Sequence, residues 1–190
     1  MPDTSDDDLP AWAKAGRTGW TWTGAARPVF AVAPGPGQES VWDYPRPPLL
    51  VPDAREVIVR HGAIEIARTR AAVRLLETSH PPTFYVPRAD VDAAALVRAR
   101  GGSLCEWKGA CSYHDVVTAE GRLERAAWSY DRPFGEAAMI AGHVAFYADR
   151  LVCFVGGERA RPQAGGFYGG WITAELVGPF KGDPETTRGW

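Results

Sequence analysis

The segment around Lys108 holds the residue whose type and setting could do the most chemistry. It reads Cys105-Glu106-Trp107-Lys108-Gly109, and a strand there would place Glu106 and Lys108 on the face opposite Cys105 and Trp107. Gly109 permits a bulge that would turn Lys108 toward a pocket. A buried lysine with a lowered pKa can act as a base, as a nucleophile or as a clamp for an anion. The alternative is an exposed pair with Glu106, which contributes little to stability.

Aromatic residues accompany this segment on the strands expected beside it. Trp128 and Tyr130 are two positions apart and so share one face of a strand. Together with neighbouring rings they could line a pocket for a planar or cationic ligand. The alternative is a plain aromatic core, because aromatic side chains most often pack against one another. The candidate ligand-binding residues are Cys105, Trp107, Lys108, Tyr113, Trp128, Tyr130 and Phe146.

A catalytic interpretation uses part of the same set. Lys108 and Tyr113 would perform acid-base or group-transfer chemistry, helped by Asp131 or His143. The spacing of Ser129 relative to Asp131 and His143 does not indicate a catalytic triad. The catalytic candidates are therefore Lys108, Tyr113, Asp131 and His143.

The cysteine and histidine spacing does not predict a metal site. Cys105, Cys111 and His114 are six and three residues apart, whereas zinc sites usually contain a pair of ligands separated by two to four residues. In one strand, Cys111 and His114 would also point to opposite faces. We therefore expect no metal and no cofactor.

The elements that must position these residues are mostly strands. Residues 57–59 and 63–67 are rich in β-branched or alternating apolar residues, and His61-Gly62 can supply the positive φ of a tight turn between them, which predicts a β-hairpin. Further strands are expected at residues 83–86, 105–107, 111–118, 123–130, 144–147 and 151–155, the last two as a hairpin.

Two segments predict short helices. Residues 70–78 have apolar side chains at helical spacing, and residues 91–99 follow Asp90, a good residue for the helix N-cap. The abundance of Gly, Pro and aromatic residues otherwise favours short strands and tight turns. The fold class is thus mainly β, with α+β at the margin.

Composition and charge exclude several classes of protein. The 190 residues carry 21 basic and 23 acidic side chains, so there is no strongly basic footprint for nucleic acid. No apolar run of 18 residues predicts a membrane span, and the acidic segment Met1 to Leu9 does not resemble a secretory signal. Three cysteines fit a reducing compartment, so we expect a cytoplasmic protein.

The chain is expected to have three parts. Residues 1–54 form an extended, partly packed N-terminal segment, because prolines and glycines interrupt regular structure while tryptophans such as Trp20 and Trp42 favour packing. Residues 55–160 form a β-rich core domain. Residues 161–190 form a C-terminal extension rich in Gly, Pro and aromatic residues.

Several ordered motifs resemble the domain-of-unknown-function 427 family. They are Leu76-Glu77-Thr78-Ser79-His80-Pro81-Pro82, Tyr85-Val86-Pro87, the Cys105 to Gly109 segment with Ser112-Tyr113, Ala127-Trp128-Ser129-Tyr130, and Ile140 to Tyr147. The flanks Ser40 to Pro45 and Phe167 to Trp171 look like those of the longer bacterial members. The resemblance implies a tent-like domain of two antiparallel sheets and no established reaction. The family pattern maps onto Cys105, Trp107, Lys108, Gly109, Tyr113, Trp128, Tyr130, Gly142 and Phe146.

The family is sometimes labelled nucleotidyltransferase-like, and the residues do not support that label. Such an enzyme needs a Gly-Ser loop followed by paired carboxylates that hold two metals. Asp90 and Asp92 stand at an expected helix start, where they favour the helix dipole. Gly101-Gly102-Ser103 follows these carboxylates instead of preceding them.

Three hypotheses for function follow. The first is a protein that binds a small molecule or a peptide in the aromatic pocket. The second is an enzyme that uses Lys108 and Tyr113. The third is a structural or interaction module whose aromatic flanks bury against a partner or a second copy, which would make a homodimer. The first is favoured, because aromatic residues are abundant and a complete catalytic set is absent from the sequence motifs.

Overall fold

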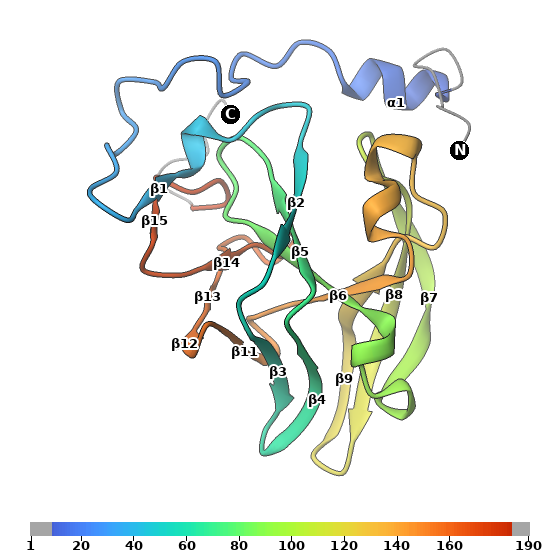
Figure 1. Ribbon diagram of the computed structural model, residues 1–190. Helices are drawn as coiled ribbons and strands as arrows, with labels where there is room; N and C mark the ends of the chain where they lie inside the picture. The colour runs from blue at the N-terminus through green and yellow to red at the C-terminus, as the bar shows by residue number, and fades with distance from the viewer. Residues whose placement is uncertain (1–8, 184–190) are drawn as a thin grey trace.

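Strands dominate the computed structural model, which describes residues 9–183 (Figure 1). The larger sheet has seven strands, in the order β2 (Leu49–Asp53), β5 (Ala72–Leu76), β6 (Thr83–Pro87), β10 (His143–Phe146), β9 (Gly121–Ser129), β8 (Gly109–Thr118) and β7 (Leu96–Cys105). The smaller sheet has four, in the order β12 (Glu158–Arg159), β11 (Val152–Val155), β3 (Val57–His61) and β4 (Ile64–Thr69). Both are antiparallel, so the expectation of a mainly β fold with antiparallel sheets is confirmed.

Short elements complete the described chain. They are the helix α1 (Ala11–Gly16), the 3-10 turns η2 (Val41–Asp43), η3 (Arg88–Asp90), η4 (Ala93–Ala95) and η5 (Gly135–Ile140), the parallel pair β1 (Glu39–Ser40) with β15 (Leu176–Val177), and the antiparallel pair β13 (Arg161–Pro162) with β14 (Trp171–Ile172). The segment Met1 to Leu9, on which the expectation about a secretory signal rests, falls almost entirely outside the described residues.

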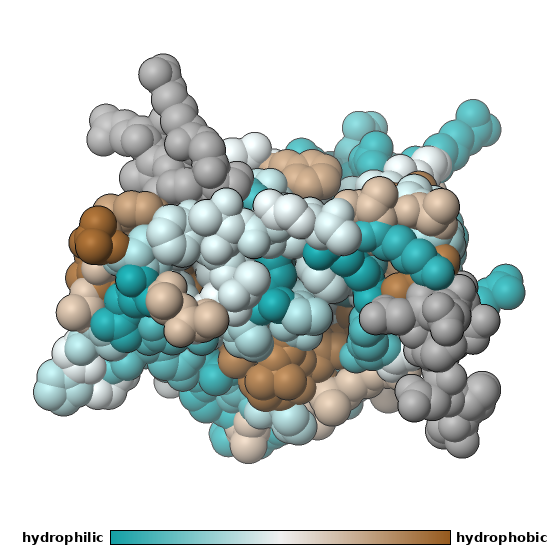
Figure 2. All heavy atoms as spheres, turned by 90° about the horizontal axis from the view of Figure 1, so that it is seen from above, coloured by the Kyte–Doolittle hydropathy of each residue, from teal (hydrophilic) through white to brown (hydrophobic). Residues whose placement is uncertain are grey.

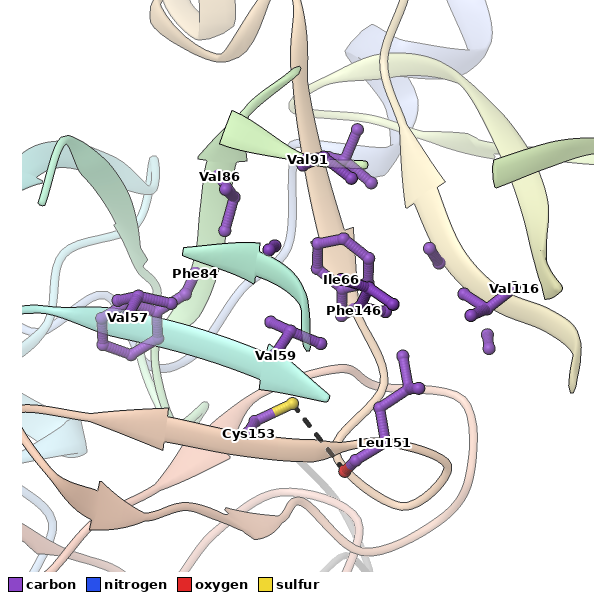
Figure 3. Close-up of a cluster of buried hydrophobic side chains, with 14 of the residues drawn as sticks. Val57, Val59, Ile66, Phe84, Val86, Val91, Val116, Phe146, Leu151 and Cys153 are labelled. Carbon is purple, nitrogen blue, oxygen red and sulfur yellow. Dashed lines mark hydrogen bonds between the residues drawn. The ribbon is translucent and has the colours of Figure 1, made fainter. Parts of the chain in front are cut away.

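The main hydrophobic core lies between the two sheets (Figure 3). Val57 and Val59 of β3 and Ile66 of β4 meet Phe84 of β6 and Phe146 of β10, all almost completely buried. Side chains alternate across a strand, so the neighbours of the larger-sheet residues in this core point to the opposite face of that sheet. That second face carries the candidate site.

Both segments predicted as helices contain strands instead. Residues 72–76 are β5, which lies between β2 and β6 in the sheet. Apolar side chains are buried on both faces of this strand, and such a run mimics helical spacing in the sequence. In the second segment only η4 is helical, and β7 begins at Leu96. Asp92, rather than Asp90, caps that turn by accepting a hydrogen bond from the backbone N–H of Ala94 at 2.9 Å.

The hairpin predicted between residues 144–147 and 151–155 is also wrong. β10 pairs with β6 and β9 in the larger sheet, whereas β11 pairs with β3 and β12 in the smaller one. The turn itself exists, because the N–H of Leu151 donates to the carbonyl of Tyr147 at 3.0 Å. The sequence between β10 and β11 indicates that the chain turns. It does not indicate that the chain passes from the larger sheet to the smaller one. The hairpin around His61-Gly62 is confirmed, with Gly62 at φ +58°.

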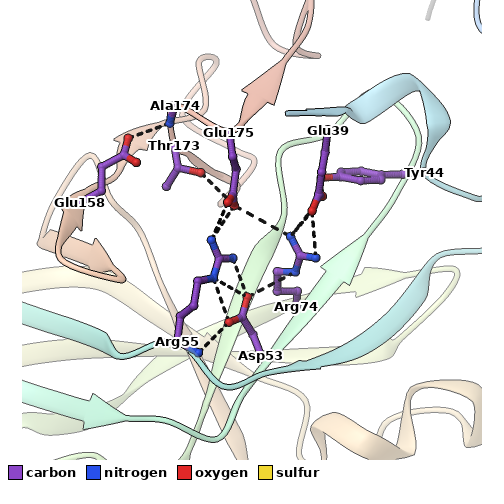
Figure 4. A network of polar contacts seen from close by, with 9 residues as sticks. All are labelled: Glu39, Tyr44, Asp53, Arg55, Arg74, Glu158, Thr173, Ala174 and Glu175. Atoms are coloured by element: carbon purple, nitrogen blue, oxygen red, sulfur yellow. Dashed lines mark hydrogen bonds and ion pairs between the residues drawn. The ribbon is translucent and has the colours of Figure 1, made fainter. Parts of the chain in front are cut away.

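The two terminal extensions are joined to each other and to the core by ionic contacts (Figure 4). Arg55 donates hydrogen bonds to the carboxylate of Asp53, the last residue of β2, and to that of Glu175 in the C-terminal extension at 2.7 Å. Arg74 of β5 reaches Glu39 of the N-terminal extension at 3.2 Å. The parallel pairing of β1 with β15 lies next to this network. The extensions therefore form one layer over the domain instead of two separate tails.

Candidate functional site

A pocket of about 230 Å³ opens on the face of the larger sheet that is turned away from the smaller one. Its floor comes from β5, β6, β8 and β9, and its rim comes from the turn after β7 and from both extensions. The residues that line it are Trp20, Leu75, Glu77, His80, Pro81, Thr83, Tyr85, Ser103, Leu104, Cys105, Glu106, Trp107, Lys108, Cys111, Tyr113, Trp128, Tyr130, Tyr147, Gln163, Phe167, Tyr168, Gly169 and Lys181.

Aromatic rings form much of the pocket wall. Trp128 of β9 lies 4.4 Å from Tyr147 between ring centroids and 6.5 Å from Tyr85 of β6. Tyr130 follows two positions after Trp128 and lies 6.5 Å from the same Tyr85 ring. These separations are within the range at which aromatic pairs attract each other, so the wall is held in place by its own contacts. The structure brings together six of the seven residues expected to bind a ligand.

Lys108 reaches this pocket from a turn and not from a strand. Residues 106–108 form the hairpin turn between β7 and β8, and Gly109 has a φ of +94°, which residues with a side chain rarely adopt. The prediction of a strand at residues 105–107 is therefore wrong beyond Cys105. Lys108 is only 8% exposed, and its ammonium lies 5.6 Å from the centre of the Tyr130 ring. An exposed pair of Lys108 with Glu106 does not form.

Lys108 is a cation at neutral pH. Burial alone would lower the pKa of Lys108, but Tyr85, Cys105 and the carboxylate of Glu77 raise it above the ordinary value. The direction of this shift is opposite to the lowered pKa that the sequence suggested. Of the roles considered for Lys108, that of a clamp for an anion agrees with a charged ammonium.

The other polar groups of the floor are neutral. Burial raises the pKa of the Cys111 thiol, and it raises the pKa of the Tyr85 phenol to about 12. The hydroxyl of Tyr113 lies 2.9 Å from that of Ser103, within hydrogen-bond distance. Around Lys108 the floor therefore offers hydroxyl and thiol groups and no second charge in direct contact.

The N-terminal extension supplies one wall of the rim. Two cations lie near the ring of Trp20: the Arg46 guanidinium is 3.9 Å and the Lys181 ammonium 5.1 Å from its centre. Arg46 in turn forms an ion pair with Glu77 at 3.0 Å. Burial alone would raise the pKa of Glu77, but His80, Lys108 and Arg46 lower it, so this carboxylate stays charged.

The C-terminal extension covers the other side of the pocket. The segment around Gly169 passes so close to the indole of Trp128 that a Cβ added to Gly169 would overlap the ring. Tyr147 donates a hydrogen bond from its hydroxyl to the carbonyl of Phe167 at 3.3 Å. The C-terminal extension therefore lies over the aromatic floor of the pocket.

His80 anchors this cover through Gln163. The Gln163 side-chain amide lies 3.0 Å from Nδ1 of His80 and donates to the carbonyl of Lys181 at 2.7 Å, while its oxygen accepts from the N–H of Gly170. With the oxygen engaged by Gly170, the amide nitrogen faces His80, so Nδ1 accepts a hydrogen bond and carries no proton. Burial lowers the pKa of His80 to about 4, in agreement with a neutral ring.

Three of the sequence candidates lie elsewhere. Phe146 is fully buried in the main core. Its neighbour on β10, Ala145, faces the pocket side of the sheet, and adjacent residues of a strand point to opposite faces. Asp131 and His143 line a separate groove near the opposite face of the sheet. In that groove Ser129 contacts His114 at 2.9 Å and Asp131 at 3.0 Å. The proposed catalytic set of Lys108 and Tyr113 with Asp131 or His143 is thus not brought together.

Three structural findings bear on metals, disulfides and membranes. Within residues 9–183, no group of three or more His, Cys, Asp or Glu side chains is arranged to hold a metal ion. Cys105, Cys111 and Cys153 are all free. In the same described part, no helix has the length and apolar character needed to cross a membrane.

Several pocket residues were not singled out from the sequence. They are Trp20, Glu77, His80, Tyr85, Tyr147, Gln163, Phe167, Tyr168, Gly169 and Lys181, among others. The resemblance motifs contain Glu77, His80, Tyr85 and Tyr147, and the resembling C-terminal flank contains Phe167, Tyr168 and Gly169, so a signal existed for these seven. Gln163 and Lys181 gave none, because only the folded extension brings them to the rim.

A family model described as a domain of unknown function (DUF427) matches residues 49–156, which is more than half of the chain. The protein therefore belongs to the DUF427 family. The matched range contains the pocket floor from β5 to β9, includes residues 49–54 at the end of the N-terminal extension, and leaves out the rest of both extensions. No curated protein matches the chain.

Proposed function

We propose that this protein binds a small organic molecule with a planar ring in the pocket between β5 to β9 and the two extensions. The observation that carries the proposal is the convergence of aromatic side chains from three parts of the chain on one half-open hollow that also contains a buried lysine. Ligand pockets have this character, with mainly apolar or aromatic walls and a few placed polar groups.

The size of the pocket favours a small molecule over a peptide. Its volume of about 230 Å³ lies below the roughly 300–1,000 Å³ of pockets for drug-sized ligands. A molecule with one or two rings is the matching size. A peptide would need a longer groove, and the Gly169 segment lies across the floor where such a groove would run.

The other two hypotheses have less support. An enzyme that uses Lys108 and Tyr113 would act in the same pocket, but the carboxylate and imidazole suggested as helpers line the other groove. An interaction module or homodimer would need an exposed aromatic surface. In the extensions Trp171 is fully buried, whereas Trp12, Phe30 and Phe167 are exposed. On the face seen from above, the strongly hydrophobic residues form separate patches (Figure 2).

We further propose a cytoplasmic protein of bacterial type without a nucleic-acid partner. The three free cysteines support a reducing compartment. The net charge of −2 argues against nucleic acid as the ligand. The resemblance to longer bacterial members of the family supports the bacterial assignment.

Indole resonances provide the test. In a two-dimensional 1H–15N spectrum, a set of one-ring and two-ring aromatic compounds is added at millimolar concentration. We expect at least one compound to shift the indole signals of Trp20, Trp107 and Trp128, because these line the pocket. The signals of Trp42 and Trp171, which are buried away from it, should not move.

A matched pair of variants provides the control. Trp20→Ala removes a ring from the rim and should weaken binding, whereas Trp12→Ala removes a partly exposed ring that packs on Phe134 outside the pocket. Both changes lie in the N-terminal extension, so neither opens the main core. If no compound moves the pocket signals, or if both variants weaken binding equally, the proposal is wrong.

A further inference from the structure

Lys108 differs from the other buried charged side chains in having no ion-pair partner. Among the described residues, the buried Asp, Glu, Lys and Arg side chains are Arg46, Asp53, Lys108 and Asp115. Arg46 pairs with Glu77, Asp53 with Arg55, and Asp115 with Arg122. No carboxylate of the described chain lies within 4.0 Å of the Lys108 ammonium. Buried charges are normally paired, and Lys108 is the exception among these four.

The groups around the lysine do not supply an ion-pair partner. Its ammonium faces the Tyr130 ring, and burial raises the pKa of the Tyr85 phenol beside it to about 12, so that hydroxyl is neutral. Glu77 is occupied by Arg46 and lies beyond ion-pair distance of Lys108. The floor of the pocket therefore carries one positive charge, on Lys108, that no side chain in direct contact balances.

A donor beside Lys108 lacks an acceptor. The indole N–H of Trp107 is buried, and no acceptor for it exists within the described part of the chain. An indole nitrogen can only donate, and Trp107 is 6% exposed and lines the same pocket. A buried donor without a partner costs stability. Trp107 thus lacks an acceptor, and its neighbour Lys108 lacks an ion-pair partner.

We propose that the ligand of this pocket is an aromatic monocarboxylate whose carboxylate accepts hydrogen bonds from the Lys108 ammonium, with its ring between the pocket aromatics. This inference rests on the proposed function and names the class of ligand. A single negative charge matches the buried Lys108 cation, whereas a phosphate dianion would bring a second negative charge to the floor near Glu77. The carboxylate also provides the acceptor oxygens that the floor lacks.

Pairs of acids and amides of equal shape test the charge requirement. Benzoate is compared with benzamide, and indole-3-carboxylate with indole-3-carboxamide, at pH 7.5, by titration of the Trp128 indole signal. A hydrogen bond to a charged group is worth enough that we expect the acid of at least one pair to bind about tenfold to hundredfold more tightly than its amide.

The three lysines of the chain give matched variants. Lys108→Met keeps the length of the side chain and removes the charge, so it should abolish the preference for the acid and leave amide binding within a few-fold. Lys14→Met changes an exposed lysine of α1 and should leave the preference intact. Phenyl phosphate serves as the dianion and should bind more weakly than benzoate.

The wild-type protein gives a readout that does not depend on a variant. The carboxyl carbon of 13C-labelled benzoic acid reports its protonation, and contact with the Lys108 cation should lower the pKa of the bound acid below that of the free acid. An unchanged or raised pKa in the bound state contradicts the inference.

The outcomes separate this inference from the proposed function. If amides bind as tightly as acids, or if the preference survives in Lys108→Met, the charged ligand is wrong while the aromatic pocket stands. If phenyl phosphate binds more tightly than benzoate, the monocarboxylate is wrong. If none of these compounds shifts the pocket indoles, both proposals fail.

Discussion

The buried, neutral ring of His80 should make the folded protein less stable as the pH falls below 6.5, with the largest effect at the cover of the pocket. The ring is neutral because burial lowers the pKa of His80 to about 4, against an ordinary 6.5. Between these two pH values the unfolded chain takes up a proton at this position and the folded chain does not. Stability from the neutral ring is therefore complete above pH 6.5 and is lost as the pH falls toward 4.

The magnitude follows from the size of the shift. A difference between 6.5 and about 4, at 1.36 kcal/mol for each pH unit, gives a loss of about 3 kcal/mol in the free energy of unfolding. Protonation would also turn the Nδ1 acceptor into a donor that faces the amide of Gln163. Because Gln163 holds Lys181 and Gly170, the effect should be largest in the C-terminal extension.

Urea unfolding of the wild type and of His80→Asn between pH 4 and pH 8 tests this account. Asparagine keeps an acceptor oxygen for Gln163 and does not titrate, so the variant should lose about 3 kcal/mol less than the wild type over this range. Subtracting the two curves removes the other titrating groups. Parallel curves, or a histidine resonance of His80 that titrates near pH 6.5, would refute the reasoning.

Three further predictions concern packing and charge, and urea unfolding measures each of them. Gly169→Ala should lower the free energy of unfolding by about 1–3 kcal/mol and shift the indole signal of Trp128, because the added methyl overlaps that ring; an unchanged Trp128 signal would contradict the contact. Arg46→Met should cost about 3–5 kcal/mol, because it leaves the Glu77 carboxylate without its partner, and adding Glu77→Gln should restore much of the loss; a double variant no more stable than the single one would contradict this. Phe146→Ala should cost about 3–5 kcal/mol as a core residue; a loss below about 1 kcal/mol would remove it from the core.

The sequence predicted the class of fold because alternation and turn residues were clear on most strands. The His61-Gly62 hairpin and the strand at residues 83–86 are examples. It failed for β5, whose two faces are both buried, because such a run carries no alternation. The prediction that β10 pairs with β11 also failed, because a turn between two strands does not determine which sheet each strand joins.

The pocket was predicted in part for a similar reason. Cys105, Tyr113 and Trp128 share the pocket face because of simple strand geometry. Phe146 was misplaced because its strand was paired wrongly, which leaves the direction of its side chains undetermined. The charge of Lys108 was misjudged because burial was weighed without the groups that face it. The rim depends on contacts between residues far apart in sequence, which local patterns do not encode.

The parallel pairing of β1 with β15 has a consequence for the order of folding. It brings together residues 39–40 and 176–177, so it closes a loop that spans most of the chain. Long loops are closed late, after local hairpins such as β8–β9 have formed. The strands of the aromatic floor precede the covering segment in the sequence, so they leave the ribosome first. Trp128 stays uncovered until the segment around Gly169 docks, and a ligand bound in that interval would be enclosed by it.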